Sequence, residues 1–493
     1  MFFTVIAILS LILAFPESPR PLLTGTRWVL PLVAIVTVLP GLIGVVVARR
    51  SLRLIDAHPE DPNVGQMELA RGSGWIAGAL LVGHSAVIGL TDWLNLCNNL
   101  PSIRGWLAVP SLAAAGPFLI SIGLAWIGTF PAERALRQIH LEMQLLRGQP
   151  ARPTWPLLRH LVFNYRHQVL FILAPMLLIL VARDLIDWYS DSLRRTGIRY
   201  LPDLLLGLSA GAVAVIAPAI LRRVWLTHPL PDGPLRDRLL RLGRKLHLRF
   251  REILVWRSGG ALVNAAVMGV IAPLRYILIT DGMLESMDDT KIEAVFGHEA
   301  GHVKRHHITY FLMLAFMSGC WIAIYSDLLM HPGRQPYEDW IGVALGAVLL
   351  VKWSIVFGWI SRTFERQADL FGVRTLELSG LPCATPCATH APAVTVAAGG
   401  DPICRTAAHV FADALYDVAA LNGIPPQAPS WRHGSIATRA NVLQAYAADP
   451  QQTAQFERRV VRLKLGILAA TALSTAAAAW FLRVWEPIER WLR

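Results

Sequence analysis

The fold of this chain is decided by the stretch Lys291-Ile-Glu-Ala-Val-Phe-Gly-His-Glu-Ala-Gly-His-Val-Lys304, taken together with Ser361-Arg-Thr-Phe-Glu-Arg-Gln-Ala-Asp369. Apolar residues in the first stretch recur at helical spacing, and Ser286, Asp288 and Asp289 ahead of it are typical of a helix start. On such a helix His298 and His302 are four residues apart, so they lie on one face. The first stretch therefore predicts a helix that presents two imidazoles side by side.

The same helix carries HEAGH, an HExxH motif. Two histidines at this spacing can hold one Zn²⁺ through their ring nitrogens, and Glu299 beside them can take a proton from a metal-bound water. Residue frequencies give about 0.02 accidental matches to this motif in a chain of this length. We therefore predict His298 and His302 as metal ligands and Glu299 as the general base.

A catalytic zinc needs a third protein ligand. Glu365 and Asp369 in the second stretch are also four residues apart on a helix that follows an apolar run. Alone, such a pair is more often a solvated helix face. Two antiparallel spans joined near Pro336 bring it close to the HEAGH helix. His302 lies eight residues before the first of these spans and Glu365 five residues after the second, so at about 1.5 Å per residue both lie within about 12 Å of the same membrane face. We predict Glu365 as the third ligand and Asp369 as a carboxylate that orients a zinc histidine.

Composition places these motifs in a membrane protein. The chain has 493 residues, 54% of them apolar and only 16% charged, and the apolar residues come in runs of about 17 to 25, the length of a membrane span. Nine runs are candidates. They cover residues 2–15, 28–48, 74–90, 107–130, 169–186, 201–221, 310–330, 341–360 and 465–482.

The formal net charge of +12 is carried mainly by Arg. No helix-turn-helix, zinc finger or aromatic-plus-basic stretch accompanies it, so we expect no nucleic-acid partner. Loops after the second, fourth, sixth and eighth spans are richer in Arg than the intervening loops, which places them in the cytoplasm under the positive-inside rule. The two longest stretches between spans, 222–309 and 361–464, then lie on the cytoplasmic side.

The predicted fold is a mainly α polytopic membrane protein whose cytosolic α+β zinc-protease domain, of the gluzincin type, is split by a transmembrane hairpin. The expected parts follow the chain in order. They are an N-terminal bundle of about six spans (1–221), the first half of the protease domain (222–309), the hairpin (310–360), the second half of the protease domain (361–464) and a C-terminal span with its tail (465–493).

HEAGH, the SRxxExxAD pattern and the membrane hairpin between them resemble type I CAAX prenyl endopeptidases and HtpX-type heat-shock proteases. The resemblance implies that Asn264 and Ala265 belong to a strand beside the cleft and bind substrate, and that RYILITDGML contains the strand leading into the zinc helix. It also implies that His433 stabilises the oxyanion and that Arg439 is a structural or substrate-facing cation. This chain departs from the family pattern at Gly434, where proline is usual.

These observations predict a membrane zinc endopeptidase with one Zn²⁺ per chain, in a multi-pass protein of a bacterial inner membrane, with its catalytic domain facing the cytoplasm. The expected partners are a peptide or membrane-protein substrate and the lipid bilayer. Two substrate roles stay open, namely clearance of damaged membrane proteins and processing of a specific substrate that is lipidated or not. The alternative from another class is a catalytically silent scaffold or transporter that retains a zinc fold.

Two further groups receive a structural interpretation. Cys383, Cys387, His390 and Cys404 lie in or just beyond a Pro/Ala/Gly-rich stretch, 380–401, without a CxxC spacing, which favours a flexible insertion over a second metal site. His306 and His307 follow the zinc helix, and we interpret both as histidines at the membrane interface, with His307 pointing away from the metal ligands.

Overall fold

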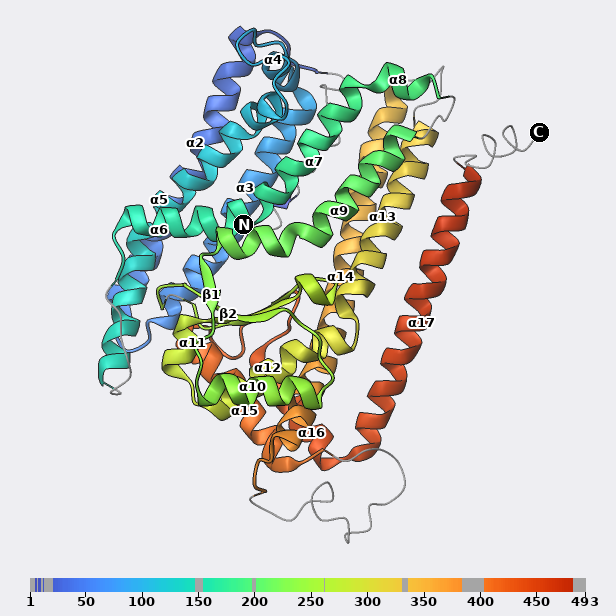
Figure 1. The fold of residues 1–493 in the computed structure, drawn as a ribbon. Helices are drawn as coiled ribbons and strands as arrows, with labels where there is room; N and C mark the ends of the chain where they lie inside the picture. Colours follow the sequence, from blue (N-terminus) through green and yellow to red (C-terminus); the bar gives the residue numbers. More distant parts are fainter. Residues whose placement is uncertain are drawn as a thin grey trace, which may run out of the picture. The chain divides into compact units, whose positions relative to one another are not determined.

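The computed structural model describes residues 5–6, 8–9, 12, 21–146, 154–196, 201–260, 262–329, 336–383 and 403–481, with the backbone alone at 144, 194, 325–329 and 336–353. The described chain is mostly helical and forms two units, Met1–Leu226 and Thr227–Arg493 (Figure 1). Most of the predicted span at 2–15, the insertion residues 384–402 with Cys387, and the tail 482–493 lie outside the described residues.

The first unit is built from helices. They are α2 (Thr26–Ala57), α3 (Asn63–Leu90), α4 (Trp93–Asn98), α5 (Val109–Leu146), α6 (Leu157–Asn164), the π-helical turn η1 (Tyr165–Val169), α7 (Leu170–Trp188), α8 (Ser190–Arg194) and α9 (Leu201–Val224). Helix α2 packs closely on α5, because Gly41 and Gly44 lie within contact distance of the α5 backbone at Leu124 and Ala125. A Cβ at either glycine would lie 2.9 Å from its neighbour, so these small residues set the helix separation.

The second unit contains four strands and the two motif helices. Its elements are β1 (Thr227–Pro229), α10 (Pro234–Lys245), β2 (Glu252–Trp256), β3 (Ala265–Met268), the 3₁₀ turn η2 (Ala272–Leu274), β4 (Tyr276–Thr280), α11 (Asp281–Ser286), α12 (Asp289–Lys304), α13 (His307–Leu329), α14 (Pro336–Ser379), α15 (Arg405–Leu421), α16 (Ile436–Ala448) and α17 (Pro450–Phe481).

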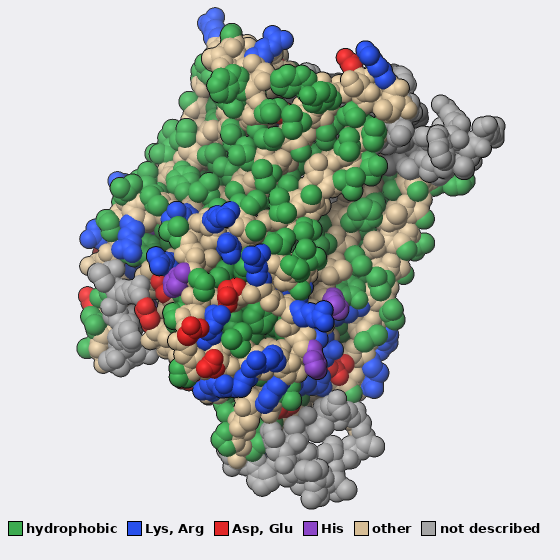
Figure 2. Space-filling view, viewed as in Figure 1, with side chains coloured by type: hydrophobic (Ala, Val, Ile, Leu, Met, Phe, Trp, Pro, Cys, Tyr) green, Lys and Arg blue, Asp and Glu red, His purple; other side chains and the backbone are tan. Residues whose placement is uncertain are grey.

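Seven helices in the described residues are long and apolar enough to cross a membrane, which supports a multi-pass membrane protein. Five are in the first unit, and in the second they are α13 up to Ile324 and α17. Helix α14 includes the predicted span at 341–360, but side chains up to 353 lie outside the description. On the face of the second unit drawn in Figure 2, Lys, Arg, Asp and Glu side chains gather over α10 and the strands.

The strands form one sheet in the order β1-β2-β4-β3. Strands β2 and β4 are parallel, whereas β1 pairs antiparallel with β2 and β3 pairs antiparallel with β4. Strand β3 is therefore at an edge. All five residues of β4 are buried, as expected for a central strand.

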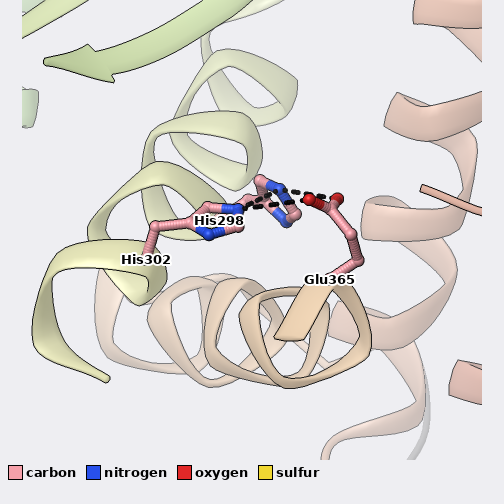
Figure 3. A group of neighbouring side chains, drawn as sticks. All are labelled: His298, His302 and Glu365. Carbon is pink, nitrogen blue, oxygen red and sulfur yellow. Dashed lines mark hydrogen bonds and ion pairs between the residues drawn. The ribbon is translucent and has the colours of Figure 1, made fainter. Parts of the chain in front are cut away.

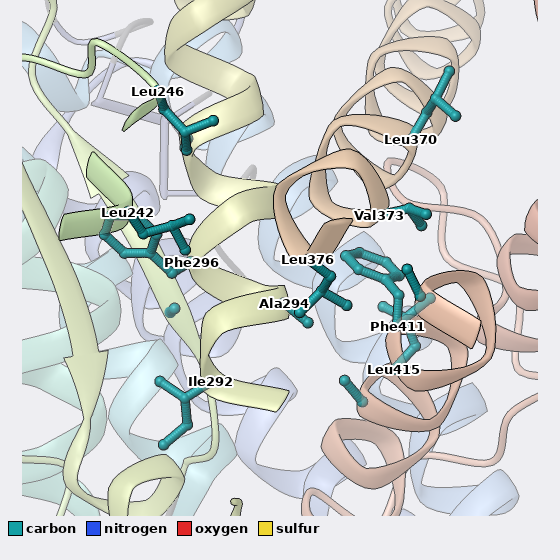
Figure 4. Close-up of a cluster of buried hydrophobic side chains, with 14 of the residues drawn as sticks. Leu242, Leu246, Ile292, Ala294, Phe296, Leu370, Val373, Leu376, Phe411 and Leu415 are labelled. Atoms are coloured by element: carbon teal, nitrogen blue, oxygen red, sulfur yellow. The ribbon is translucent and has the colours of Figure 1, made fainter. Parts of the chain in front are cut away.

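Helix α12 is the predicted HEAGH helix. Its N-cap is Asp288, whose carboxylate accepts a hydrogen bond from the amide of Lys291 at 2.9 Å, as the sequence predicts. Its buried face lies in the apolar core of the second unit, between α10 on one side and α14 and α15 on the other (Figure 4). The core residues drawn around it include Leu242, Phe296, Val373, Leu376 and Phe411.

Two glycines let α12 approach α14. A Cβ at Gly297 would lie 2.7 Å from the Cβ of Thr375, and one at Gly301 would lie 3.1 Å from the Cα of Ala368. Thr375 and Ala368 are fully buried, so neither can move aside into solvent. The spacing of the two glycines therefore sets the distance between the histidine-bearing helix and the Glu365-bearing helix.

We expect Gly297→Ala to lower the stability of the second unit by about 1–3 kcal/mol, because the added methyl overlaps Thr375 in a close-packed interface. The matched control is Gly319→Ala in α13, where an added Cβ meets no atom within 4 Å. Thermal unfolding midpoints of the purified chain in detergent measure both. Equal midpoints for the two variants would contradict the proposed role of Gly297.

Candidate active site

Three side chains from two helices converge at the α12–α14 contact. His298 and His302 come from α12 and Glu365 from α14, and they point toward one another (Figure 3). The Nε2 atoms of the two histidines are 3.1 Å apart. The Glu365 carboxylate oxygens lie 3.6 Å from His298 Nε2 and 3.7 Å from His302 Nε2.

These separations fit a common metal ion. Tetrahedral ligand atoms about 2.0–2.1 Å from one zinc lie about 3.3–3.4 Å from each other, close to the three distances above. Two imidazole nitrogens and one carboxylate are also a ligand set that zinc takes in catalytic sites. The residues that the sequence predicts as ligands are therefore brought together in a geometry suited to that ion.

The pKa values of the two histidines shift in opposite directions. Burial acts to lower the pKa of His298, but contact with Asp369 and the charge of Glu365 outweigh it and raise that pKa. The pKa of His302 falls to about 3, through burial and then the charge of His298. His302 is therefore neutral at physiological pH, the state in which an imidazole ligates a metal.

Glu365 is ionised although it is buried. Burial alone would raise its pKa, but a hydrogen bond from His433 and the charge of Arg439 hold the pKa well below the usual value for a glutamate. His433 Nδ1 lies 3.0 Å from Glu365 Oε1. A buried ionised carboxylate beside two imidazoles is an attractive site for a cation.

Asp369 lies behind His298, with Oδ1 2.9 Å from the ring Nδ1. The guanidinium of Arg439 contacts both carboxylate oxygens of Asp369, with Nε 2.9 Å from Oδ2. Arg439 is 8% exposed, and its Nη2 is 3.6 Å from Glu365. The guanidinium of Arg439 is thus turned into the protein and paired with two carboxylates, an arrangement that favours a structural role over a contact with substrate.

Glu299 lies on the same helix and faces the sheet edge. Its Oε2 accepts a hydrogen bond of 2.9 Å from the amide of Val267 in β3. Burial is the main cause that raises the pKa of Glu299 to about 7. A carboxylate with this pKa can gain and lose a proton near neutral pH.

The edge strand β3 presents part of its backbone outward. Asn264 pairs with Thr280 through both its amide and its carbonyl. Because backbone groups alternate in direction along an antiparallel strand, those of Ala265 and Val267 point away from β4. On that outer side Asn422 pairs with both backbone groups of Val263, at 3.0 and 2.8 Å. The outer backbone of Ala265 therefore lies between two positions occupied by Asn422 and Glu299.

His433 and Gly434 lie in the loop before α16. His433 is 48% exposed. Gly434 has φ +76°, and its amide donates to the Ser430 carbonyl at 2.9 Å. Proline cannot adopt this φ, and it has no amide N–H to donate this hydrogen bond. The loop conformation therefore excludes the proline that is usual in the family, whereas glycine fits it.

His307 is a residue that the sequence interpretation placed wrongly. Helix α12 ends at Lys304, His306 has φ +57°, and α13 starts at His307. This turn brings His307 back against His302, where it is fully buried with Nδ1 3.0 Å from His302 Nδ1. On one continuous helix His307 would point away from His302, and nothing in the sequence marks the left-handed residue that ends α12. His306 is exposed.

Part of the second unit is similar to known peptidases. Residues 229–394 match the model of peptidase family M48. The predicted resemblance to CAAX prenyl and HtpX-type proteases is thereby confirmed, since named members of both groups are among the similar proteins.

A CAAX prenyl protease 1 homolog of Arabidopsis thaliana is 30% identical over 159 residues, which are 30% of this chain and 38% of that protein. A protease HtpX homolog of Aeropyrum pernix is 27% identical over 195 residues, 37% of this chain and 60% of that protein. This chain thus spans less than two thirds of the length of either relative. The crystal structure of S. mikatae Ste24p aligns with a TM-score of 0.49 and 14% identity, over 85% of this chain and 99% of that one.

We expect Gly434→Pro to distort the loop that carries His433, because proline imposes a φ near −65° and removes the amide that bonds Ser430. Peptide cleavage should fall while bound zinc stays near that of the unmodified chain, since no predicted ligand lies in the loop. The control is Gly434→Ala, which retains the amide and should lose less. A Gly434→Pro variant with full activity would contradict this loop geometry.

Proposed function

We propose that the chain is a zinc-dependent endopeptidase of the membrane. The observation that carries this proposal is the convergence of His298, His302 and Glu365 at spacings of 3.1 to 3.7 Å, with Glu299 bonded to the edge strand β3 beside them. The M48 match over residues 229–394 supports the same class of activity. His298, His302 and Glu365 would hold one Zn²⁺ per chain.

When bound, the zinc ion would lower the pKa of its water and polarise the carbonyl of the scissile bond. Glu299 accepts a proton from the attacking water and gives it to the leaving amine. The amide of Val267 holds the Glu299 carboxylate in place, which fixes the base relative to the edge strand. Asp369, held by Arg439, fixes the ring of His298.

The substrate would bind as an added strand along β3. Main-chain pairing to a sheet edge holds an extended peptide without fixing its sequence. Asn422 occupies the outer backbone of Val263 and Glu299 contacts Val267, so the substrate would pair at Ala265 between them. Asn264 is exposed next to this position and would contact the substrate side chains. Since Arg439 is buried, we propose no direct substrate contact for it.

His433 would stabilise the oxyanion of the tetrahedral intermediate. Its contact with Glu365 places it beside the ligands, and its 48% exposure leaves it accessible to a substrate. A donor aimed at developing charge typically contributes about 10²–10³-fold to the rate. In this role His433 acts from the loop before α16.

The two motif stretches, 222–309 and 361–464, would form one protease domain of the gluzincin type, interrupted by the hairpin 310–360. The Arg-rich loops favour a cytoplasmic orientation in a bacterial inner membrane. The substrate role is either clearance of damaged membrane proteins or processing of a specific protein that is lipidated or not. A silent zinc-fold scaffold or transporter is the alternative, and the intact base and ligands argue against it.

Glu299→Gln should reduce cleavage of a fluorogenic peptide by about 10²–10⁴-fold, because the amide cannot take a proton. Bound zinc should stay near one per chain, since Glu299 is not a predicted ligand. The control is Glu285→Gln, an exposed carboxylate of the same unit, which should retain activity. Undiminished cleavage by Glu299→Gln would remove the proposed base, and a wild-type chain that binds no zinc would refute the proposed function.

The pH dependence follows from Glu299. Its raised pKa of about 7 means that the ionised base is lost as the pH falls through that value, and a bound cation shifts the transition lower. We therefore expect kcat/KM to fall on the acid side with a midpoint at or below pH 7. Zinc content measured at each pH separates this effect from metal loss. A flat profile between pH 5 and 8 with zinc fully bound would contradict it.

A further inference from the structure

Lys464 of α17 contacts both the end of α12 and α14. Its Nζ donates to the carbonyl of Arg305 at 2.7 Å and to Oε1 of Gln367 at 2.9 Å. The same ammonium lies over the rings of Tyr310 and Phe364, at 5.2 and 5.4 Å from their centroids. Because Arg305 is the C-cap of α12, Lys464 joins the end of the histidine-bearing helix to the helix that carries Glu365.

A chain of hydrogen bonds runs from Lys464 to a proposed zinc ligand. Gln367 Oε1 is 2.9 Å from His307 Nε2, and His307 Nδ1 is 3.0 Å from His302 Nδ1. His307 and Gln367 are 0% and 7% exposed. The ring of Phe364 stacks on His307 with centroids 4.4 Å apart and planes 3° from parallel, so the His307 ring is fixed in orientation.

Lys464 determines where the protons of this chain lie. An ammonium only donates, so the atom of Gln367 that faces it must be the oxygen. That oxygen only accepts, so His307 must carry its proton on Nε2. A neutral His307 then accepts at Nδ1, which requires the proton of His302 to be on Nδ1. His302 Nε2, the atom that faces His298 and Glu365, is left with a lone pair.

The opposite arrangement disables the ligand. With the Gln367 amide reversed, its NH₂ group would face the ammonium, and His307 Nε2 would become the acceptor. His307 would then donate from Nδ1, and a neutral His302 would carry its proton on Nε2, where no metal can bind. Only one arrangement of the chain therefore gives a ligating His302.

We propose that Lys464 is a positioning residue that, through Gln367 and His307, holds His302 in the tautomer able to bind the metal. This inference rests on the proposed function for the identity of His302 as a ligand. It assigns α17 a role beyond anchoring: the helix supplies the ammonium that orders the protons beside the metal site.

The test is the zinc dissociation constant of the full chain in detergent, measured by competition with a chromogenic chelator. We expect Lys464→Met and Gln367→Met to weaken zinc binding about 10- to 100-fold, as loss of a partner behind a metal ligand does. Gln367→Glu should restore wild-type affinity, because its carboxylate accepts from both Lys464 and His307. The matched control is Arg462→Met, which removes an exposed charge two residues from Lys464 and should leave affinity unchanged.

Thermal unfolding of each metal-free variant separates this role from a structural one. Lower stability with unchanged zinc affinity in Lys464→Met and Gln367→Met would overturn the proposal, as would equal loss in Gln367→Glu and Gln367→Met. A failure of the proposed function gives a different result. An unmodified chain that binds zinc but cleaves no peptide would refute the peptidase function. The zinc affinities of the variants would still test the hydrogen-bond chain from Lys464 to His302.

Discussion

The close packing of α12 on α14 is the constraint on which the rest of the site depends. Gly297 directly precedes the HEAGH motif and Gly301 lies within it, and without side chains at these two positions the helix axes come near enough for His298 and His302 to meet Glu365. In soluble and membrane helices alike, small residues four apart permit such an approach. The metal motif and the packing motif are thus interleaved in one helical stretch.

Charge balance is the second constraint. Glu365 and Asp369 are 4% and 1% exposed, and buried carboxylates are costly unless they are paired. Arg439 contacts both and is the one buried arginine among the described residues, whereas His433 supplies a further donor to Glu365. A divalent cation at the proposed site would supply the positive charge that the remaining carboxylate oxygens and imidazole nitrogens are arranged to accept.

The sequence was most informative where chemistry and helical period coincide. HEAGH and SRTFERQAD each place two side chains four residues apart, and the structure brings those four side chains together as the periodicity implied. The sequence did not predict the contacts that depend on a turn or on a helix distant in the chain. His307 depends on the left-handed conformation of His306, and Lys464 is the last residue of the predicted stretch 361–464, where the sequence gives no sign of a contact with the site. Neither contact has a periodic signature, because each is set by how whole helices pack.

The central claim is that two imidazoles and one carboxylate of this chain bind zinc. X-ray absorption at the zinc edge of the purified full chain tests it most directly. The account predicts about one zinc per chain with nitrogen and oxygen ligands at about 2.0–2.1 Å and no sulfur ligand. Absence of bound zinc, or a sulfur shell at about 2.3 Å that places the metal on the cysteines instead, would contradict it.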